Sequence, residues 1–140
     1  MESMESKALV DGTVTIFPNV YKSREPHHIS IRKIFDRIRN GKSKELVAKI
    51  RAADSKEQKL ELKKQLPSIC FAGSFKHRDN HGIIDHAGFI CLDFDHLTSF
   101  EKLLEFKEDL KRSKYVFAAF ISPSGDGMKV IVRIPKDIKN

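Results

Sequence analysis

The clearest pattern along the chain is a strict alternation of side chains in residues 88–95, GFICLDFD. Successive side chains of a strand point to opposite faces, so this segment is predicted to be a strand with two different faces. One face is apolar and carries Ile90, Leu92 and Phe94. The other face begins apolar and ends in two carboxylates, with Phe89, Cys91, Asp93 and Asp95. The second face therefore has apolar residues at its start and a candidate functional site, the two aspartates, at its end.

The carboxylates of Asp93 and Asp95 need an explanation because their Cα atoms lie only about 7 Å apart in a strand. Neighbouring carboxylates repel, and a hard divalent cation such as Mg²⁺ or Mn²⁺ is the usual partner. The alternative is structural: the pair ends the strand and forms a turn or caps the next helix. Residues 98–101, TSFE, already form a capping box, with Thr98 at the cap and Glu101 reaching back. At least one aspartate is therefore predicted to have another role.

The remaining elements follow from the same periodicities. Strands are predicted at residues 13–17, 68–72, 115–121 and 128–134. Helices are predicted for residues 31–39 after Ser30, from Ser43 onward, for 55–66 and for 99–112. The inner side of the last helix is predicted to carry Phe100, Leu103, Leu104, Phe106, Lys107 and Leu110. Polar residues indicate a linker at His27 and His28 and a loop at 74–85.

The order of elements after Ala87 is strand, helix, strand, tight turn and strand. A helical crossover makes the first two strands parallel, and the tight turn makes the second and third antiparallel. This order predicts an α+β fold with a ferredoxin-like or RNA-recognition-like mixed sheet that carries its helices on one face. Such a unit normally has another helix and strand, so either the earlier strands complete the sheet or the domain continues beyond Asn140. We expect one domain over residues 1–140, with a helical segment at 31–66 and a sheet core at 67–134.

Charge is distributed unevenly along the chain. Lys and Arg number 26 against 19 acidic residues, which gives a net charge of +7. Residues 31–66 hold 12 basic and 5 acidic residues, and the rest of the chain holds 14 of each, so the whole excess lies in the helical segment. A localised basic surface favours polyanions, with nucleic acid the first candidate. The alternative is a solvated helix face whose charges pair with one another.

The last predicted strand places basic residues on the face of the two aspartates. Its predicted core face consists of Met128, Val130, Val132 and Ile134. Lys129 and Arg133 then lie on the opposite face, which is predicted to be the uncovered side of the sheet. Carboxylates for a cation, with basic groups nearby, indicate a nucleoside triphosphate or a nucleic-acid backbone as the ligand.

The turn before this strand, residues 122–127 or SPSGDG, adds candidate phosphate contacts. Gly125 and Gly127 allow backbone N–H groups to approach an anion closely, and Ser122 and Ser124 offer hydroxyls. The same residues are also typical of a β-hairpin turn, and this alternative explains them without any ligand.

Several other classes of protein find no support in the sequence. No apolar run reaches the ~20 residues needed to cross a bilayer, and residues 1–6 lack signal-peptide features, so we expect a cytoplasmic protein without membrane contact. Cys70 and Cys91 lie in apolar runs and are predicted to be buried free thiols. The chain has no Walker A loop and no Gly-x-Ser-x-Gly motif. The histidines in the predicted loop region lack the spacing of a zinc site, so they indicate a solvated loop.

Together these motifs resemble the archaeo-eukaryotic primase superfamily of primase-polymerases. The resemblance rests on residues 92–95, LDFD, followed after a helix by residues 120–130, FISPSGDGMKV. Three further runs are similar to the BT4734-like or VirE-like N-terminal domain of Bacteroides proteins: residues 15–17 (TIF), 66–69 (LPSI) and 73–75 (GSF). The resemblance covers most of the chain.

The resemblance implies that Asp93 and Asp95 bind divalent metals and act in nucleotidyl transfer. Lys129 stands where the superfamily usually presents a histidine to the phosphates of the nucleotide. A third metal-binding carboxylate normally lies on a later strand, and after Lys129 the chain offers only Asp137. The resemblance also implies helicase-like or primase-associated modules as C-terminal partners.

Two functions are therefore expected. The first is a primase-polymerase-like domain that binds metal, nucleoside triphosphate and DNA. Its phosphate contacts are predicted to be Ser122, Ser124, Gly125, Gly127, Lys129 and Arg133. The alternative is a non-catalytic nucleic-acid-binding module of a mobile-element or replication protein, which the basic segment and Lys129 favour.

Overall fold

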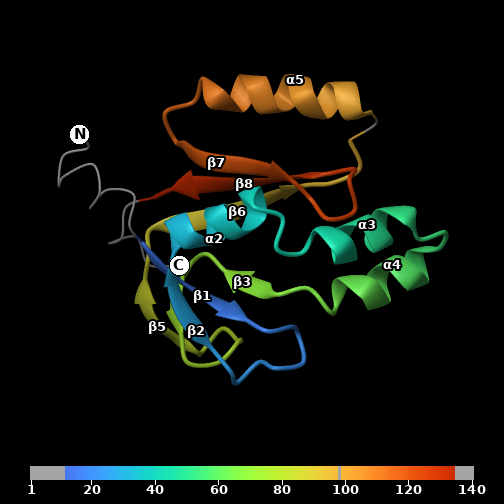
Figure 1. The fold of residues 1–140 in the computed structure, drawn as a ribbon. Coiled ribbons are helices and arrows are strands. Elements are labelled where there is room, and N and C mark those ends of the chain that lie inside the picture. The colour runs from blue at the N-terminus through green and yellow to red at the C-terminus, as the bar shows by residue number, and fades with distance from the viewer. Residues whose placement is uncertain (1–11, 98, 135–140) are drawn as a thin grey trace.

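The computed structural model describes residues 12–97 and 99–134 of the 140-residue chain (Figure 1). Its helices are α2 (Ile31–Arg39), α3 (Lys44–Ala52), α4 (Lys56–Lys63) and α5 (Phe100–Lys111). Its strands are β1 (Thr13–Phe17), β2 (His27–Ser30), β3 (Ser68–Cys70), β4 (Gly73–Phe75), β5 (Ile83–His86), β6 (Phe89–Phe94), β7 (Val116–Ile121) and β8 (Met128–Arg133). The predicted α+β class is confirmed.

The strands of these residues form three small antiparallel sheets rather than the one mixed sheet that we predicted. The first sheet has the order β2-β1-β3, the second pairs β4 with β5, and the third has the order β6-β8-β7. The alternative in which the earlier strands complete the C-terminal sheet is wrong, because β1 pairs with β2 and β3 instead.

The third sheet has the strand directions that the sequence predicts. β8 lies between β6 and β7 and runs antiparallel to both, so β6 and β7 run in the same direction, as a crossover through α5 requires. Asp93 lies directly opposite Lys129 in the register of β6 and β8. On the other face of β6, Phe94 contacts Phe106 of α5 with ring centroids 4.9 Å apart. The two faces of β6 are therefore assigned as predicted.

One face of the third sheet is covered by α5 (Figure 1). Leu103 of α5 is buried against Met128 and Val130 of β8, and Val132 packs against this cluster, which confirms three of the four residues of the predicted core face; Ile134 is not part of it. The predicted inner side of α5 is only partly right, because Phe100 and Leu104 are exposed. The three-stranded sheet covers only part of the apolar face of α5, so some apolar side chains of the helix remain exposed.

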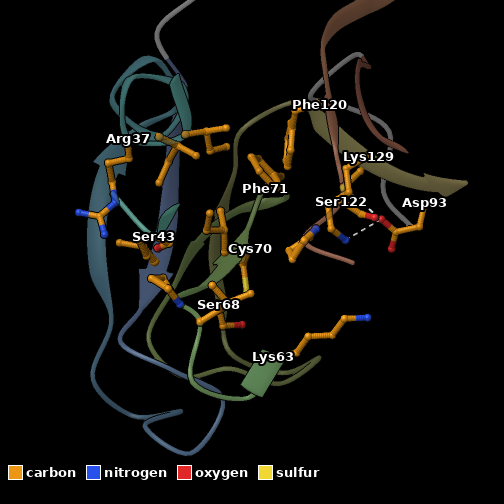
Figure 2. A pocket seen from close by; sticks show the side chains of 18 of the residues that line it. Arg37, Ser43, Lys63, Ser68, Cys70, Phe71, Asp93, Phe120, Ser122 and Lys129 are labelled. Carbon is orange, nitrogen blue, oxygen red and sulfur yellow. Dashed lines mark hydrogen bonds and ion pairs between the residues drawn. The ribbon is translucent and has the colours of Figure 1, made fainter. Parts of the chain in front are cut away.

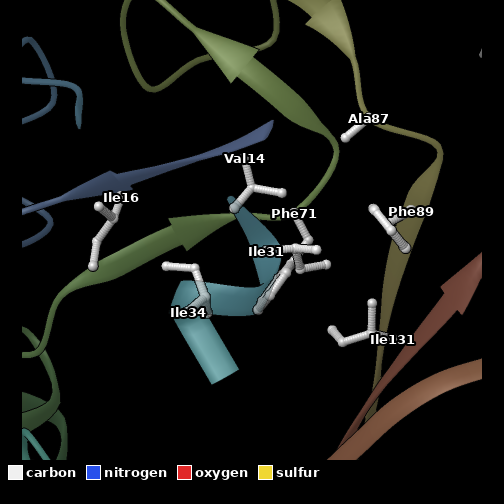
Figure 3. Close-up of a cluster of buried hydrophobic side chains, with 8 residues drawn as sticks. All are labelled: Val14, Ile16, Ile31, Ile34, Phe71, Ala87, Phe89 and Ile131. Carbon is white, nitrogen blue, oxygen red and sulfur yellow. The ribbon is translucent and has the colours of Figure 1, made fainter. Parts of the chain in front are cut away.

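The opposite face of the third sheet is not open, contrary to the prediction of helices on one face only. A cluster of buried side chains joins this face to α2 and to the first sheet (Figure 3). Its members include Val14 and Ile16 of β1, Ile31 and Ile34 of α2, Phe89 of β6 and Ile131 of β8. The cluster holds α2 against both sheets.

Three of the described helices begin after a serine whose hydroxyl caps them. Ser30, Ser55 and Ser99 each accept the backbone N–H of the residue three positions later. The cap of α5 is therefore Ser99, not the predicted Thr98, which lies outside the described residues. Ser43 precedes α3 as predicted, but its side chain makes no capping hydrogen bond. In the described ranges no helix combines the length and apolarity that crossing a bilayer requires.

Two segments that we predicted to be irregular contain strands. β2 begins at His27, within the predicted linker, and the predicted loop at 74–85 includes parts of β4 and β5. β2 pairs with β1, and β5 pairs with β4. Tertiary hydrogen bonds stabilise β4: the buried Thr15 hydroxyl donates to the Gly73 carbonyl at 2.9 Å and accepts the Phe75 N–H at 2.8 Å. The local sequence of these strands carries no comparable signal.

Leu103 and Leu104 test which side of α5 packs. Leu103→Ala should lower the free energy of unfolding by about 2–5 kcal/mol, because it removes buried contacts and leaves a cavity. Leu103 is 1% exposed and Leu104 is 45% exposed, so Leu104→Ala should cost less than about 1 kcal/mol. Urea unfolding followed by circular dichroism measures both losses. Equal losses would mean that α5 packs through a different face.

Candidate functional site

A cleft of about 1170 Å³ opens between the third sheet, the first sheet and the helices α2, α3 and α4. Figure 2 shows Arg37 and Ser43 on one wall, with Asp93, Lys129 and Ser122 on the opposite wall. The second wall is the end of β6 and β8 together with the turn after β7, so the two chain segments singled out by the sequence lie in one place.

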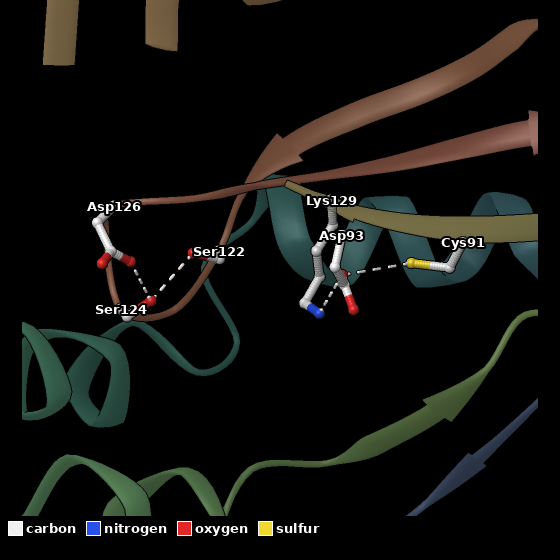
Figure 4. A network of polar contacts seen from close by, with 6 residues as sticks. All are labelled: Cys91, Asp93, Ser122, Ser124, Asp126 and Lys129. Atoms are coloured by element: carbon white, nitrogen blue, oxygen red, sulfur yellow. Dashed lines mark hydrogen bonds and ion pairs between the residues drawn. The ribbon is translucent and has the colours of Figure 1, made fainter. Parts of the chain in front are cut away.

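Asp93 and Lys129 form an ion pair at this wall (Figure 4). Lys129 Nζ donates to Asp93 Oδ1 at 2.8 Å, and both side chains are partly exposed. The contact follows from the register, because residues directly opposite on neighbouring strands point to the same face. The structure thus brings together the acidic and the basic residue that the sequence placed on one face.

Asp95 follows β6, is exposed, and lines the same cleft. Its carboxylate lies beside the turn: a Cβ added at Gly127 would be 3.2 Å from Asp95 Oδ1 and 2.7 Å from the Phe94 carbonyl oxygen. Gly127 is therefore required by the close approach of the turn to the end of β6. This structural role accounts for the glycine without any ligand.

The hydroxyls of the turn at residues 122–127 bind within the turn (Figure 4). Ser124 Oγ donates to Asp126 Oδ1 at 2.7 Å, and Ser122 Oγ lies 3.1 Å from Ser124 Oγ. Because Ser124 gives its single proton to Asp126, Ser122 is the donor between the two serines. The hydrogen bond from Ser124 also lowers the pKa of Asp126. Both hydroxyl protons are used, so the predicted phosphate contacts require an exchange of these bonds.

The backbone of the turn is also partly committed. Gly125 has a φ of 86° and donates its N–H to the Ser122 carbonyl at 2.9 Å. The Ser122 N–H donates in turn to the Gly127 carbonyl at 2.9 Å. The Gly125 N–H, predicted to approach an anion, therefore closes the turn instead.

Arg133 does not join the other predicted site residues. It lies four residues beyond Lys129, about 13 Å along the strand, and does not line the cleft. Its guanidinium lies 5.6 Å from the ring centroid of Phe89 and 5.1 Å from that of Phe117. Cation–π contacts with two aromatic side chains hold it at the far end of β8. Its predicted phosphate contact has no support in this geometry.

Basic side chains gather around the cleft. Five of the twelve basic residues of the segment 31–66 line it, whereas none of the five acidic residues of that segment does. The five are Arg37, Lys42, Lys44, Arg51 and Lys63. Arg78 and Lys129 bring the basic side chains to seven, and the acidic ones that line the cleft are Asp79, Asp93 and Asp95. The sequence predicted a basic surface but did not identify which of its residues face the site.

The carboxylates fit a divalent cation only in part. Asp93 and Asp95 supply the oxygen ligands that Mg²⁺ and Mn²⁺ prefer. A cation at Asp93 Oδ1 has to displace the Lys129 ammonium, and its other positions would be filled by water or by ligand oxygens. Across residues 12–97 and 99–134, no three His, Cys, Asp or Glu side chains are grouped to hold a metal. Asp137, the one carboxylate residue that the sequence offers after Lys129, lies outside the described residues.

Both cysteines are free thiols as predicted, but they are half-buried rather than buried. Burial raises the pKa of the Cys91 thiol, and the neighbouring Asp93 carboxylate raises it further. Burial likewise raises the pKa of Cys70. Both line the cleft, and their raised pKa values keep them as neutral thiols at neutral pH.

Residues 61–140 match a protein-family model described as BT4734-like, N-terminal domain, and this match spans more than half of the chain. The chain belongs to the BT4734-like N-terminal domain family. No curated protein and no solved structure matches it. The match begins within α4, so the family region contains the Asp93–Lys129 pair and the turn, whereas the basic residues of α2 and α3 precede it.

The hydrogen bond from Ser124 to Asp126 of the BT4734-like domain can be tested by titration. It lowers the folded-state pKa of Asp126, so it contributes stability that is present above the unfolded-state pKa of about 3.9 and is lost as the pH falls through the folded-state pKa. Ser124→Ala should raise the pKa of Asp126 towards its usual value, as NMR titration of its carboxyl carbon would show. Ser113→Ala, outside the turn, is the control. An unchanged Asp126 in Ser124→Ala would contradict this assignment.

Proposed function

We propose that this BT4734-like domain is a primase-polymerase-like domain whose cleft binds nucleoside triphosphate and DNA, with Mg²⁺ or Mn²⁺ at Asp93 and Asp95. The observation that carries the proposal is the excess of positive charge around the cleft, which seven basic and three acidic side chains line. Clefts lined mainly by one sign of charge concentrate ligands of the opposite sign. Phosphate groups are the anions that such a density of Lys and Arg suits best.

The link to primase-polymerases rests on the spacing of the two motifs in one family region. Asp93 and Asp95 end β6, and the turn with Lys129 follows after one helix and one strand. The pairing of β6 with β8 gives that spacing a physical meaning, because it places both motifs at the same end of one sheet. Both motifs lie within residues 61–140, the part of the chain that matches the BT4734-like family model.

Each wall of the cleft then has its own role. Lys129 and Arg51 lie beside the turn and are placed to neutralise phosphate groups. Arg37 lies on the opposite wall with Ser43, which Lys42 and Lys44 flank in the chain, and these basic residues suit a nucleic-acid backbone. Asp93 and Asp95 would hold a divalent cation, which would add to the neutralisation of phosphate and would activate a coordinated hydroxyl.

A non-catalytic nucleic-acid-binding module is the second candidate. The ion pair between Lys129 and Asp93 favours it, because the ammonium neutralises one of the two carboxylates that would hold a cation. The basic side chains of the cleft bind nucleic acid equally well without a metal. The two candidates therefore differ in whether binding depends on a divalent cation.

Metal-dependent nucleotide binding separates them. Asp93→Asn combined with Asp95→Asn should weaken Mn²⁺-dependent binding of a fluorescent deoxynucleoside triphosphate by about tenfold or more, because both charged ligands are lost. Fluorescence anisotropy in Mn²⁺ and in EDTA measures the effect. Asp36→Asn combined with Asp109→Asn removes the same charge outside the cleft and should leave binding unchanged.

The outcomes assign the function. DNA binding that ignores both EDTA and the cleft double variant would reject the metal site and select the non-catalytic module. Template-dependent primer synthesis in Mn²⁺ would reject that module. A wild-type protein that binds neither the triphosphate nor DNA would reject both candidates.

The basic wall is tested separately with single-stranded DNA. Arg37→Gln combined with Lys44→Gln should reduce the slope of log K against log salt concentration by about 1.4, because each lost phosphate contact removes about 0.7. Lys33→Gln combined with Arg39→Gln removes the same charge from the same segment at positions that do not line the cleft. Equal changes in the two double variants would mean that the segment acts through its total charge rather than through the cleft.

A further inference from the structure

Arg51, in the last turn of α3, connects the helices to the turn between β7 and β8. Its Nε donates to the Pro123 carbonyl at 3.3 Å, and its Nη2 donates to the Ser122 carbonyl at 3.2 Å. These partners lie 72 and 71 residues further along the chain. The side chain therefore links two walls of the cleft that are formed by segments far apart in the sequence.

The turn is shaped to receive this guanidinium. Gly125 has a φ of 86°, and a Cβ at this position would lie 3.3 Å from Arg51 Nε. The Ser122 carbonyl accepts both the Gly125 N–H, which closes the turn, and the Arg51 guanidinium. The conformation of the turn and the position of Arg51 are therefore coupled through one acceptor.

The helix holds its own end of this link. Ile50, the residue before Arg51, is fully buried and is the only buried residue of α3. Its burial anchors the helical turn that carries Arg51. The backbone at Arg51 is therefore held in place, and the guanidinium extends to the turn from a fixed position.

The charge of Arg51 is not neutralised by these contacts. Both acceptors are neutral carbonyls, and none of the ion pairs formed within the described ranges includes Arg51. The side chain also lines the cleft. A guanidinium has five N–H donors in a planar fork, so it can hold two carbonyls and still face an anion.

We propose that Arg51 is a positioning residue that fixes the β7–β8 turn against α3 and presents its positive charge to an anion in the cleft. The positioning part stands on the contacts alone. The anion part rests on the proposed function, so the two parts are tested with different measurements.

Hydrogen exchange tests the positioning part without any ligand. Arg51→Lys keeps the charge but loses the fork that reaches two carbonyls, so the Gly125 amide should exchange roughly fivefold to tenfold faster than in the wild type. Arg51→Gln should show the same acceleration. Arg37→Gln, which removes a cleft arginine without a hydrogen bond to the turn, should leave this amide unchanged. Should Arg51→Gln fail to fold, Arg51→Lys carries the test alone.

Binding of single-stranded DNA at several salt concentrations tests the second part. Arg51→Lys should weaken binding about threefold to tenfold at every salt concentration without changing the salt slope, because geometry is lost and charge is kept. Arg37→Gln should instead lower the slope by about 0.7, with a loss that fades as salt rises. Arg51→Gln should combine both effects.

Three results would be decisive. Wild-type exchange at Gly125 in Arg51→Lys would overturn the positioning role. Faster exchange with unchanged DNA affinity in Arg51→Lys would overturn the link between the turn and the anion. Faster exchange in a protein whose wild type binds no DNA would uphold the positioning role while rejecting the proposed function.

Discussion

The buried cluster around α2 is the contact on which the cleft depends. Ile31 and Ile34 are fully buried in one cluster with Val14 of β1, Phe89 of β6 and Ile131 of β8, so a single short helix fixes the first sheet relative to the third. Burial of each such side chain contributes about 1.5–3 kcal/mol. The cleft takes its walls from both sheets, whereas α3 buries one residue, Ile50, and α4 buries none. The site is therefore a property of the whole domain rather than of the paired strands β6 and β8 alone.

The parts of the fold that were predicted correctly are those whose stability is encoded locally. β1, β6 and β8 show apolar periodicity in the sequence. The helices α2 and α4 each follow a serine, Ser30 or Ser55, whose side chain caps them. β2, β4 and β5 are short, and their partners come from other parts of the chain. β1 pairs with β2, the Thr15 hydroxyl bonds to Gly73 and Phe75 of β4, and β4 pairs with β5. The open sheet face was predicted wrongly for the same reason, since only the tertiary structure shows that α2 covers it.

The site divides along the same line. The Asp93–Lys129 contact could be predicted because it needs only strand alternation and the pairing of β6 with β8. Arg133 shares the same alternation, yet two aromatic rings at the other end of β8 hold its guanidinium. The role of Arg51 could not be predicted, because its partners are backbone carbonyls more than 70 residues away. Every residue has a backbone carbonyl, so the sequence does not indicate which ones a side chain will contact. Periodicity therefore predicts which face a residue occupies, but not what else reaches that face.

The ion pair between Asp93 and Lys129 has to be judged by its exposure. The side chains are 52% and 33% exposed, and such pairs contribute only about 0–1 kcal/mol, so the pair neither stabilises the fold strongly nor prevents a cation from reaching Asp93. Its larger effect is on the charge of the cleft. With Asp93 neutralised by Lys129, six other basic side chains face only Asp79 and Asp95. Such an excess of basic side chains favours anions over free cations as ligands. A cation would therefore bind the aspartates more readily together with an anion, and metal dependence is the property that separates the two candidate functions.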